Sequence, residues 1–487
     1  MHRLFLILAM VVLLMAAGSP AADTSVSRGL AKQPEVAAAI KVFDAWATVT
    51  AATREQPGMS IGLVYDQDLI WAKGYGFADL EKKTAATPAT LYRIASITKL
   101  FTTTAIMQLR DAGKLQLDDP VSKHLAWFKP RNPYPQAPVL TIRHLVTHTS
   151  GLPREAAGTN WSDLKFPSRK EMMQMLADQE AVLPPETEWK YSNLALAIAG
   201  EVVAAVSGEP WEQYVENRVL KPLNMNATWV IPKADTPGLA TAYGRRVPGK
   251  ARDTEPFVDI AAVRPCGNMA SSVEDLAKFI SLQFREGPAG RGQLLKASTL
   301  REMQRVQWLR PDWRSGWGLG FSIRRVGEQV RVGHSGGLPG HITRIEFSAA
   351  DKFGVIVLTN ANDGDPLRYV DQAFTLLTPA IQRAVAPPKQ AAAPDPAWDK
   401  YAGTYSWKHA DVQVMVLTGE LVLINPEAEN PWETRTLLKP IQEKAHTFRM
   451  VSPSPGYSAS GELLWFEVAP DGRVTRMSTA NNYWLRK

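Results

Sequence analysis

Strand-like patterns occur in two neighbouring segments near the start of the chain, 59–65 and 70–76, and predict a β-hairpin. The three polar residues between the two segments form the expected turn. Helical periodicity appears on either side of the hairpin: residues 35–50 predict a helix with one apolar face, and residues 96–112 predict another that ends at Gly113. A sheet covered by helices is therefore expected to begin close to the N-terminus.

The middle of the chain, from about 120 to 260, is predicted to be mostly helical with proline-rich loops, and it includes an apolar helix over 194–207. Four later segments predict successive antiparallel strands, and a helix over about 367–385 is expected after them. These strands are 318–323, 329–334, 342–347 and 354–359. A sheet with helices at both ends of the sequence and a helical insert indicates an α+β fold over 35–385.

A second domain is predicted at the C-terminal end of the chain. Residues 386–397 are rich in proline and alanine and predict a linker. Alternating segments separated by turn signals follow it, so residues 398–487 predict a small all-β domain, either a barrel or a sandwich. The expected strands are 401–405, 412–417, 421–424, 463–468 and 474–477.

The first residues have the pattern of a secretory signal peptide, with a basic start, an apolar run and small residues after it. The apolar run from Leu4 to Ala17 is too short to span a bilayer comfortably, because spanning takes about 20 apolar residues. We therefore expect a signal peptide over 1–22, cleavage near its end, and a periplasmic or secreted protein without a membrane span.

Composition narrows the function classes further. The chain carries a net charge of +7 but no basic run or repeat, so a nucleic-acid partner is not predicted. Cys266 is the single cysteine, which makes an intramolecular disulfide impossible. The expected partner is a small-molecule or peptide substrate, and the sequence predicts no oligomeric state.

Three short motifs carry the candidate chemistry. Ser96 and Lys99 lie three apart at a predicted helix start, so they share one face and the lysine can take or relay the serine proton. Tyr191 and Asn193 form the second motif: a phenol can act as a general base, and an amide can both donate and accept. The third motif begins at His334 and continues through Ser335, Gly336 and Gly337.

In this order the motifs resemble the signature of the serine β-lactamase and penicillin-binding-protein superfamily. The tyrosine of the second motif points to the class C branch, which also holds DD-peptidases, D-aminopeptidases and esterases. Flanking residues 91–99 and 141–152 agree with that branch, and the resemblance covers roughly residues 37–383. It implies a β-lactamase-like antiparallel sheet flanked by helices. The C-terminal segment resembles the lipocalin-like β domain appended to several proteins of this branch.

The resemblance assigns roles to these residues. It implies that Ser96 is the nucleophile, that Lys99 and Tyr191 move protons, and that Asn193 and His334 orient the substrate. The resemblance also implies an oxyanion hole made of the backbone N–H groups of the nucleophile and of the residue after the third motif, here Gly337, with Ser335 and Gly336 lining the strand beside it. No metal or organic cofactor is implied.

Competing interpretations remain for several of these residues. Residues 333–337 also match the G-x-S-x-G nucleophile elbow, but a strand and not a helix is predicted to follow. Asn193 also fits the N-cap of the helix over 194–207. His144 and His148 have a zinc spacing, yet no third ligand is evident and structural histidines are favoured.

The sequence therefore predicts an exported serine hydrolase that forms a covalent acyl-enzyme. His334 stands where typical β-lactamases have lysine, and imidazole holds a carboxylate less firmly, gaining charge only below about pH 6.5. This favours an ester, an amide or a D-amino-acid peptide as substrate. The alternatives are a class C-type β-lactamase and a non-catalytic recognition protein of the same fold.

Overall fold

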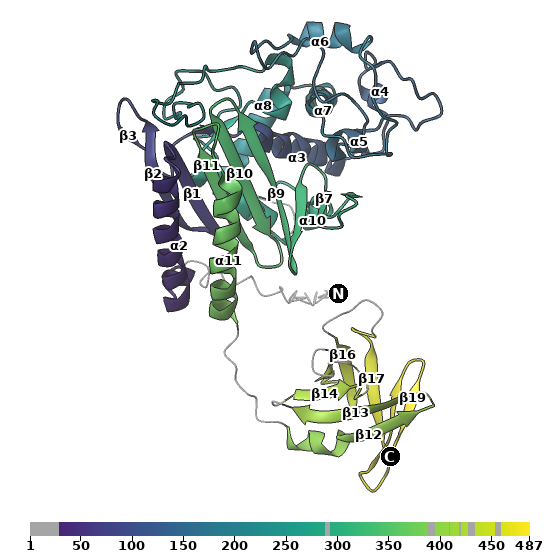
Figure 1. Ribbon diagram of the computed structural model, residues 1–487. Helices are drawn as coiled ribbons and strands as arrows, with labels where there is room; N and C mark the ends of the chain where they lie inside the picture. The colour runs from purple at the N-terminus through teal and green to yellow at the C-terminus, as the bar shows by residue number, and fades with distance from the viewer. Residues whose placement is uncertain are drawn as a thin grey trace, which may run out of the picture. The chain divides into compact units, whose positions relative to one another are not determined.

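The computed structural model divides into two compact units, residues 1–385 and 386–487, each with its own core (Figure 1). The predicted signal peptide, residues 1–22, and most of the predicted linker lie outside the described residues. The described residues are 29–287, 293–386, 395–408, 410–417, 420–426, 434–452 and 459–487.

A nine-stranded antiparallel sheet in the order β3-β2-β1-β11-β10-β9-β8-β7-β6 forms the centre of the first unit. The strands are β1 (Gly58–Tyr65), β2 (Asp68–Asp79), β3 (Thr84–Ala85), β6 (Trp308–Leu309), β7 (Ser315–Trp317), β8 (Ser322–Val326), β9 (Gln329–Leu338), β10 (His341–Ser348) and β11 (Phe353–Thr359). The α+β prediction and the N-terminal hairpin are confirmed.

Both faces of this sheet are buried under helices. Helices α2 (Pro34–Thr53) and α11 (Pro366–Val385) lie side by side on one face (Figure 1), where they share a core with alternate residues of β11 such as Val357. The larger core on the other face includes residues of α3 (Thr98–Asp111), α7 (Asn193–Ser207) and α9 (Val273–Gln283).

Among the described residues, helix α2 is long and apolar enough to cross a membrane by length and composition alone, and α7 with residues 211–223 is so only if the two bent helices are counted as one span. The apolar face of α2 packs on the sheet through residues such as Phe43, and its Asp44 accepts a hydrogen bond from Lys73 at 2.7 Å. These contacts are those of a helix that packs one face against the sheet of a folded domain.

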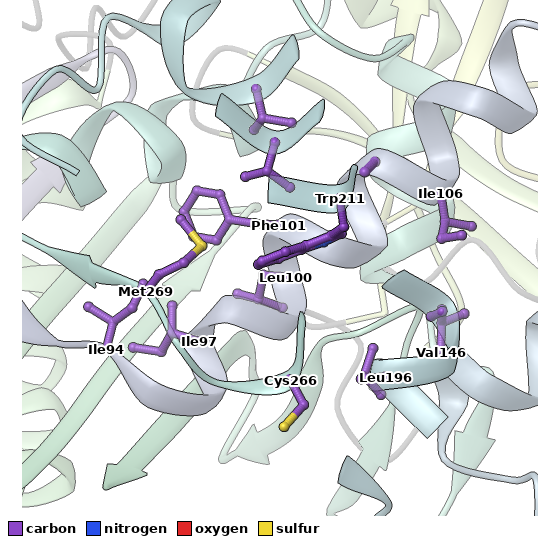
Figure 2. Packing of buried hydrophobic residues seen from close by; sticks show 14 of the residues in the cluster. Ile94, Ile97, Leu100, Phe101, Ile106, Val146, Leu196, Trp211, Cys266 and Met269 are labelled. Carbon is purple, nitrogen blue, oxygen red and sulfur yellow. The ribbon is translucent and has the colours of Figure 1, made fainter. Parts of the chain in front are cut away.

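The helix expected over 96–112 begins differently. Residues Ala95–Ile97 form a 3-10 turn, and the regular helix α3 starts at Thr98 and ends before Gly113, whose φ is 70°. The first turns of α3 are fully buried, and Phe101 stacks on Phe279 of α9 with ring centroids 4.4 Å apart. Figure 2 shows the apolar side chains that pack around this part of α3. The serine before it is therefore held on a rigid base.

The insert is less helical than predicted. Its helices besides α7 are short, and the described residues from 224 to 260 contain none. Prolines and short apolar runs break the helical pattern there. The remaining elements are α4 (Val121–His124), α5 (Ile142–Thr147), α6 (Arg169–Leu176), α8 (Trp211–Val215), η2 (Glu216–Leu220), η3 (Lys221–Leu223), η4 (Ala261–Cys266), α10 (Ala297–Gln304) and a small sheet of β4 (Tyr92–Arg93) with β5 (Ala270–Ser271).

The second unit is a closed β-barrel, which confirms the predicted all-β domain. Its core is aromatic, and Tyr401 stacks on Phe466 at 4.6 Å. Tyr401 ends a 3-10 turn, η5 (Pro396–Tyr401), so the first strand begins later than predicted. No strand was predicted at 436–440, 447–451 or 483–486, where the structure has one each. The strands are β12 (Gly403–Trp407), β13 (Ala410–Leu417), β14 (Glu420–Ile424), β15 (Thr436–Pro440), β16 (Thr447–Val451), β17 (Leu463–Val468), β18 (Val474–Thr479) and β19 (Tyr483–Arg486).

Candidate active site

The Lys99 ammonium lies at the centre of the candidate site. It is fully buried and donates to the hydroxyl of Ser96 at 2.9 Å, to Oδ1 of Asn193 at 2.8 Å and to the backbone oxygen of Cys266 at 2.7 Å. These three acceptors use all three N–H groups of the ammonium. A fully paired cation beside a serine oxygen lowers the free energy of negative charge on that oxygen.

The segment that carries Ser96 is held in a strained turn. Ala95, the residue before the serine, has a φ of 47°, in the left-handed region that side chains rarely adopt. Such a conformation costs about 1–3 kcal/mol and persists only where its surroundings enforce it. Here Ile94 donates from its backbone N–H to Met269 at 2.9 Å, and Ala95 is completely buried.

Helix α7 positions Asn193 as its first residue. The N-cap is Ser192, whose hydroxyl accepts from the N–H of Ala195 at 2.9 Å, so the prediction that Asn193 caps this helix is wrong by one residue. The Asn193 side chain is free to reach across to Lys99, and its Nδ2 donates to Oε1 of Glu155 at 2.8 Å.

Tyr191 lies beneath the lysine. The Lys99 nitrogen is 4.8 Å from the centroid of the Tyr191 ring, and the Arg154 guanidinium carbon is 5.2 Å from it. His148 and Trp317 contact the same ring, with centroids 4.4 Å and 6.1 Å away. The Tyr191 hydroxyl has no hydrogen-bond partner among the described residues, so it remains available to a ligand.

The third motif lies on β9 where that strand becomes an edge. Strand β8 pairs with β9 only as far as Gly333, so the residues after it pair with β10 alone. Their open side faces the turn that holds Ser96. A Cβ atom at Gly336 would lie 2.2 Å from the backbone oxygen of Ile94 and 2.4 Å from Oγ1 of Thr343. Glycine is therefore needed for the close approach of this strand.

Ser335 and Gly337 are exposed on the same edge. In the β9–β10 register, Ser335 lies opposite Arg344 and Gly337 opposite Ile342. After Leu338 the chain turns directly into β10, so no helix follows the G-x-S-x-G pattern. The nucleophile-elbow interpretation of Ser335 is therefore wrong.

His334 is a neutral, buried imidazole. It is 3 % exposed, and its Nδ1 donates to the backbone oxygen of Ser335 at 2.5 Å. Burial, assisted by the nearby Lys99 cation, lowers its pKa to about 3. The expectation that His334 gains charge below about pH 6.5 is therefore wrong, because the protonated ring would be buried away from water.

Two cavities meet at Ser96. One, of about 440 Å³, is bordered by Glu155, Asn193 and the exposed indole of Trp161. The other, of about 540 Å³, has an aromatic wall of Trp189, Tyr191 and Trp317. Ser96, Arg154 and Gly337 line both cavities.

The second cavity is basic. No aspartate or glutamate is among the described residues that line it, whereas four arginines are: Arg154, Arg310, Arg324 and Arg344. Arg324 and Arg344 share the carboxylate of Glu346 at 2.8 Å and 2.7 Å. Arg310 lies over Trp189, with its guanidinium carbon 5.6 Å from the ring centroid, and forms no ion pair with a described residue.

The other residues singled out from the sequence have structural partners. His144 contacts Glu186 through Nε2 at 2.9 Å, and Nδ1 of His148 accepts from the N–H of Ser192 at 3.1 Å. Burial holds the pKa of His148 well below its usual value and raises the pKa of the Cys266 thiol to about 11. Within the described parts of the chain, no three His, Cys, Asp or Glu residues are placed to share a metal ion.

Several contributors to the site were missed from the sequence, among them the backbone oxygen of Cys266, Glu155, Arg344 and the other cavity arginines. The Cys266 backbone oxygen carries no side-chain signal, and neither Glu155 nor Arg344 belongs to a motif considered there. Glu155 lies three residues beyond the flanking segment 141–152, so extending that segment would have drawn attention to it. Arg344 is found only through the strand register.

Comparison with known proteins identifies the family of the chain. The family model described as beta-lactamase matches residues 43–379, and the chain belongs to that family. Protein flp of Staphylococcus aureus is 30 % identical over 312 residues, which are 63 % of this chain and 60 % of that protein. Beta-lactamase-like protein 2 of Dictyostelium discoideum is 27 % identical over 66 % of this chain and 59 % of its own length. The match thus spans about three fifths of these relatives.

Solved structures share the fold. The octameric penicillin-binding protein homologue from Pyrococcus abyssi has a TM-score of 0.61 at 24 % identity, covering 92 % of this chain and 100 % of its own. A D-stereospecific amidohydrolase from Streptomyces sp. has a TM-score of 0.57 at 24 % identity, covering 68 % of this chain and 97 % of its own. At these identities the likeness shows the fold alone.

Proposed function

We propose that this protein is an exported serine hydrolase that forms a covalent acyl-enzyme at Ser96. The observation that carries the proposal is the hydrogen bond of 2.9 Å from a fully buried Lys99 ammonium to the Ser96 hydroxyl, at the junction of two cavities. A lysine within hydrogen-bond reach of a partly exposed serine, and itself oriented by Asn193 and Cys266, is the arrangement that nucleophilic catalysis needs.

In the proposed reaction, the Ser96 oxygen attacks a substrate carbonyl carbon. Lys99 and Tyr191 relay the protons: Lys99 takes the serine proton as it gives one of its own through the Tyr191 hydroxyl to the leaving group, so its charge is unchanged. The Lys99 ammonium, held by Asn193 and Cys266, stabilises the serine oxygen as charge develops. Water then hydrolyses the acyl-enzyme and returns Ser96 to its starting state.

The third motif completes the proposed oxyanion hole. The backbone N–H groups of Ser96 and Gly337 hold the carbonyl oxygen, and both residues line both cavities. Gly336 permits the close approach, Ser335 borders the basic cavity, and the neutral His334 packs beside Trp317 at 5.5 Å and orients the strand edge.

The proposed substrate is an ester, an amide or a D-amino-acid peptide. Arg154, Arg324 and Arg344 are paired with protein carboxylates, whereas Arg310 pairs with none among the described residues. Arg310 therefore favours a substrate whose group in that cavity carries a carboxylate, since guanidinium binds carboxylates in a bidentate manner. Of the three substrate classes, a D-amino-acid peptide with a free carboxylate meets this condition most directly.

We propose that residues 1–22 direct export to the periplasm or beyond, and that the barrel of 398–487 folds as a separate domain joined by the linker 386–397. Within the described residues, a Pro396–Tyr401 turn precedes the barrel. The sequence and fold call for no cofactor in the proposed reaction.

A class C-type β-lactamase is a second candidate function, and the basic cavity is the observation that favours it, because β-lactams also carry a carboxylate. A non-catalytic recognition protein is disfavoured, since such a protein is expected to have lost at least one catalytic group, whereas Ser96, Lys99 and Tyr191 are all present.

A hydrolysis panel tests the proposal. It contains a short-chain p-nitrophenyl ester, a chromogenic cephalosporin, a D-Ala-D-Ala peptide and a D-amino-acid amide. We expect turnover of the ester or of a D-amino-acid substrate, abolished by Ser96→Ala. Faster hydrolysis of the cephalosporin than of every other substrate would identify a β-lactamase instead.

A further inference from the structure

One carboxylate contacts the catalytic constellation without belonging to any motif. Glu155 Oε1 accepts from Nδ2 of Asn193 at 2.8 Å, and Oδ1 of the same amide accepts from Lys99 at 2.8 Å. Lys99 in turn donates to Ser96. Glu155, Asn193, Lys99 and Ser96 thus form one continuous chain of hydrogen bonds.

We propose that Glu155 is a positioning residue that fixes the orientation of the Asn193 amide and, through it, the Lys99 ammonium. This inference rests on the proposed function, because it assigns Glu155 to the same nucleophilic reaction. Glu155 does not touch the reacting atoms. Its effect on Ser96 passes through Asn193 and Lys99.

The orientation of the Asn193 amide is set by which of its neighbours can donate a hydrogen bond and which can accept one. A lysine ammonium only donates and an ionised carboxylate only accepts, whereas the two ends of an asparagine amide differ. With Oδ1 toward Lys99 and Nδ2 toward Glu155, both bonds form. In the flipped orientation, the amide N–H groups would face the ammonium and its oxygen would face the carboxylate, so both bonds would be lost.

Losing these two hydrogen bonds costs free energy, because the groups that form them are buried. Lys99 is fully buried and Asn193 is 6 % exposed, so little water is at hand to replace a missing acceptor. An ammonium that lost Asn193 would keep Ser96 and Cys266 alone and would leave one buried N–H unsatisfied. The position of the ammonium relative to Ser96 therefore depends on the amide orientation.

The backbone around Glu155 is tied to the same helix start. The oxygen of Pro153 accepts from the Ser192 hydroxyl at 2.6 Å, and the oxygen of Arg154 accepts from the N–H of Asn193 at 2.7 Å. These bonds involve the backbone of residues 153 and 154, so they survive a change of the Glu155 side chain. A Glu155 variant therefore leaves this backbone in place. Because the Glu155 carboxylate also pairs with Arg154 at 3.2 Å, the Asn193→Ala background is needed to separate the two side-chain contacts.

The test measures the rate constant at which a fluorophosphonate probe labels the full chain, with release of fluoride as the Ser96 oxygen bonds to phosphorus. Four variants are compared with the wild type: Glu155→Ala, Glu155→Gln, Asn193→Ala and the double variant of Glu155→Ala with Asn193→Ala. The control is Glu186→Ala, which also removes a carboxylate bonded to a buried side chain, that of His144, outside both cavities.

We expect Glu155→Ala to slow labelling about tenfold to a hundredfold. This is the rate change that corresponds to losing one hydrogen bond in a series of hydrogen bonds that involves charged groups. Glu155→Gln recovers most of the rate, because its amide oxygen can accept the same bond. In the Asn193→Ala background, Glu155→Ala has no further effect. Glu186→Ala labels at the wild-type rate.

Multiplicative losses in the double variant would overturn the inference, because Glu155 would then act independently of Asn193. A wild-type rate in a folded Glu155→Ala variant would overturn it as well. These results leave the proposed function intact. A folded wild-type protein that the probe does not label would instead overturn both.

Discussion

Gly336 offers a sharp test of how the third motif is held against the nucleophile. In Gly336→Ala, the added methyl group would lie 2.2 Å from the backbone oxygen of Ile94 and 2.4 Å from Oγ1 of Thr343. Ordinary contact begins near 3.4 Å, so the strand and the Ser96 turn must separate by about 1 Å. The obstructing Ile94 atom belongs to the backbone and cannot rotate away.

Two effects of known size follow from that separation. Overpacking a tight contact destabilises a protein by about 1–3 kcal/mol, which corresponds to a fall in Tm of about 2–6 °C for a large domain. A misplacement of about 1 Å at a catalytic site lowers the rate by about a hundredfold. Differential scanning fluorimetry and the rate of fluorophosphonate labelling measure the two effects on the same sample.

The neighbouring glycine supplies a matched control for stability. In Gly337→Ala, the nearest atom to the new methyl group is Cδ1 of Ile342 at 3.6 Å, an ordinary contact. We expect a Tm within about 1 °C of the wild type for this variant. If Gly336→Ala kept both the wild-type Tm and the wild-type labelling rate, the close approach of β9 to Ile94 would be refuted.

Three further predictions concern charge, selectivity and the barrel. Burial lowers the pKa of His334 and of His341 to about 3 in the folded state, whereas an unfolded histidine protonates near pH 6.5. Between pH 7 and pH 5 only the unfolded state therefore gains these protons, and the free energy of unfolding should fall by up to about 2 kcal/mol per histidine. Chemical denaturation at the two pH values should show a shallower fall for His341→Gln. Arg310→Gln should lower kcat/KM about tenfold for a D-amino-acid peptide with a free carboxylate but not for its C-terminal amide; equal losses would contradict the role of the basic cavity. A chain shortened to end at Val385 should stay soluble and be labelled at the wild-type rate, whereas aggregation would show that it needs the barrel.

The predicted fold rested on strong local patterns. The strands β1, β2 and β11 are long runs rich in apolar and β-branched residues, so their type and position could be predicted from the residues alone. The insert was predicted less well. Its short helices α4 and α8 depend on packing against other parts of the fold, which the local sequence pattern does not show. Residues 318–321 read as a strand, yet Gly320 has a φ of 78° and a Cβ there would meet Thr103 at 2.6 Å.

The site residues fall into two groups in the same way: some could be predicted from local motifs, and others depend on the three-dimensional fold. Ser96, Lys99 and Asn193 came from local motifs, and the structure brings them within hydrogen-bond distance of one another through Lys99. The charge state of His334 did not follow from its identity, because burial and not the intrinsic pKa of imidazole decides it. The role of Glu155 could not be predicted from the sequence, because only the fold shows which loop reaches the start of α7.

The central claim is that Ser96 is the nucleophile, and the residue that a fluorophosphonate probe modifies tests it most directly. Mass spectrometry of the digested, labelled protein should locate the phosphonyl group on the peptide that contains Ser96, and Ser96→Ala should abolish labelling while Ser335→Ala retains it. Modification of Ser335 in the wild type, or undiminished labelling of Ser96→Ala, would contradict the claim.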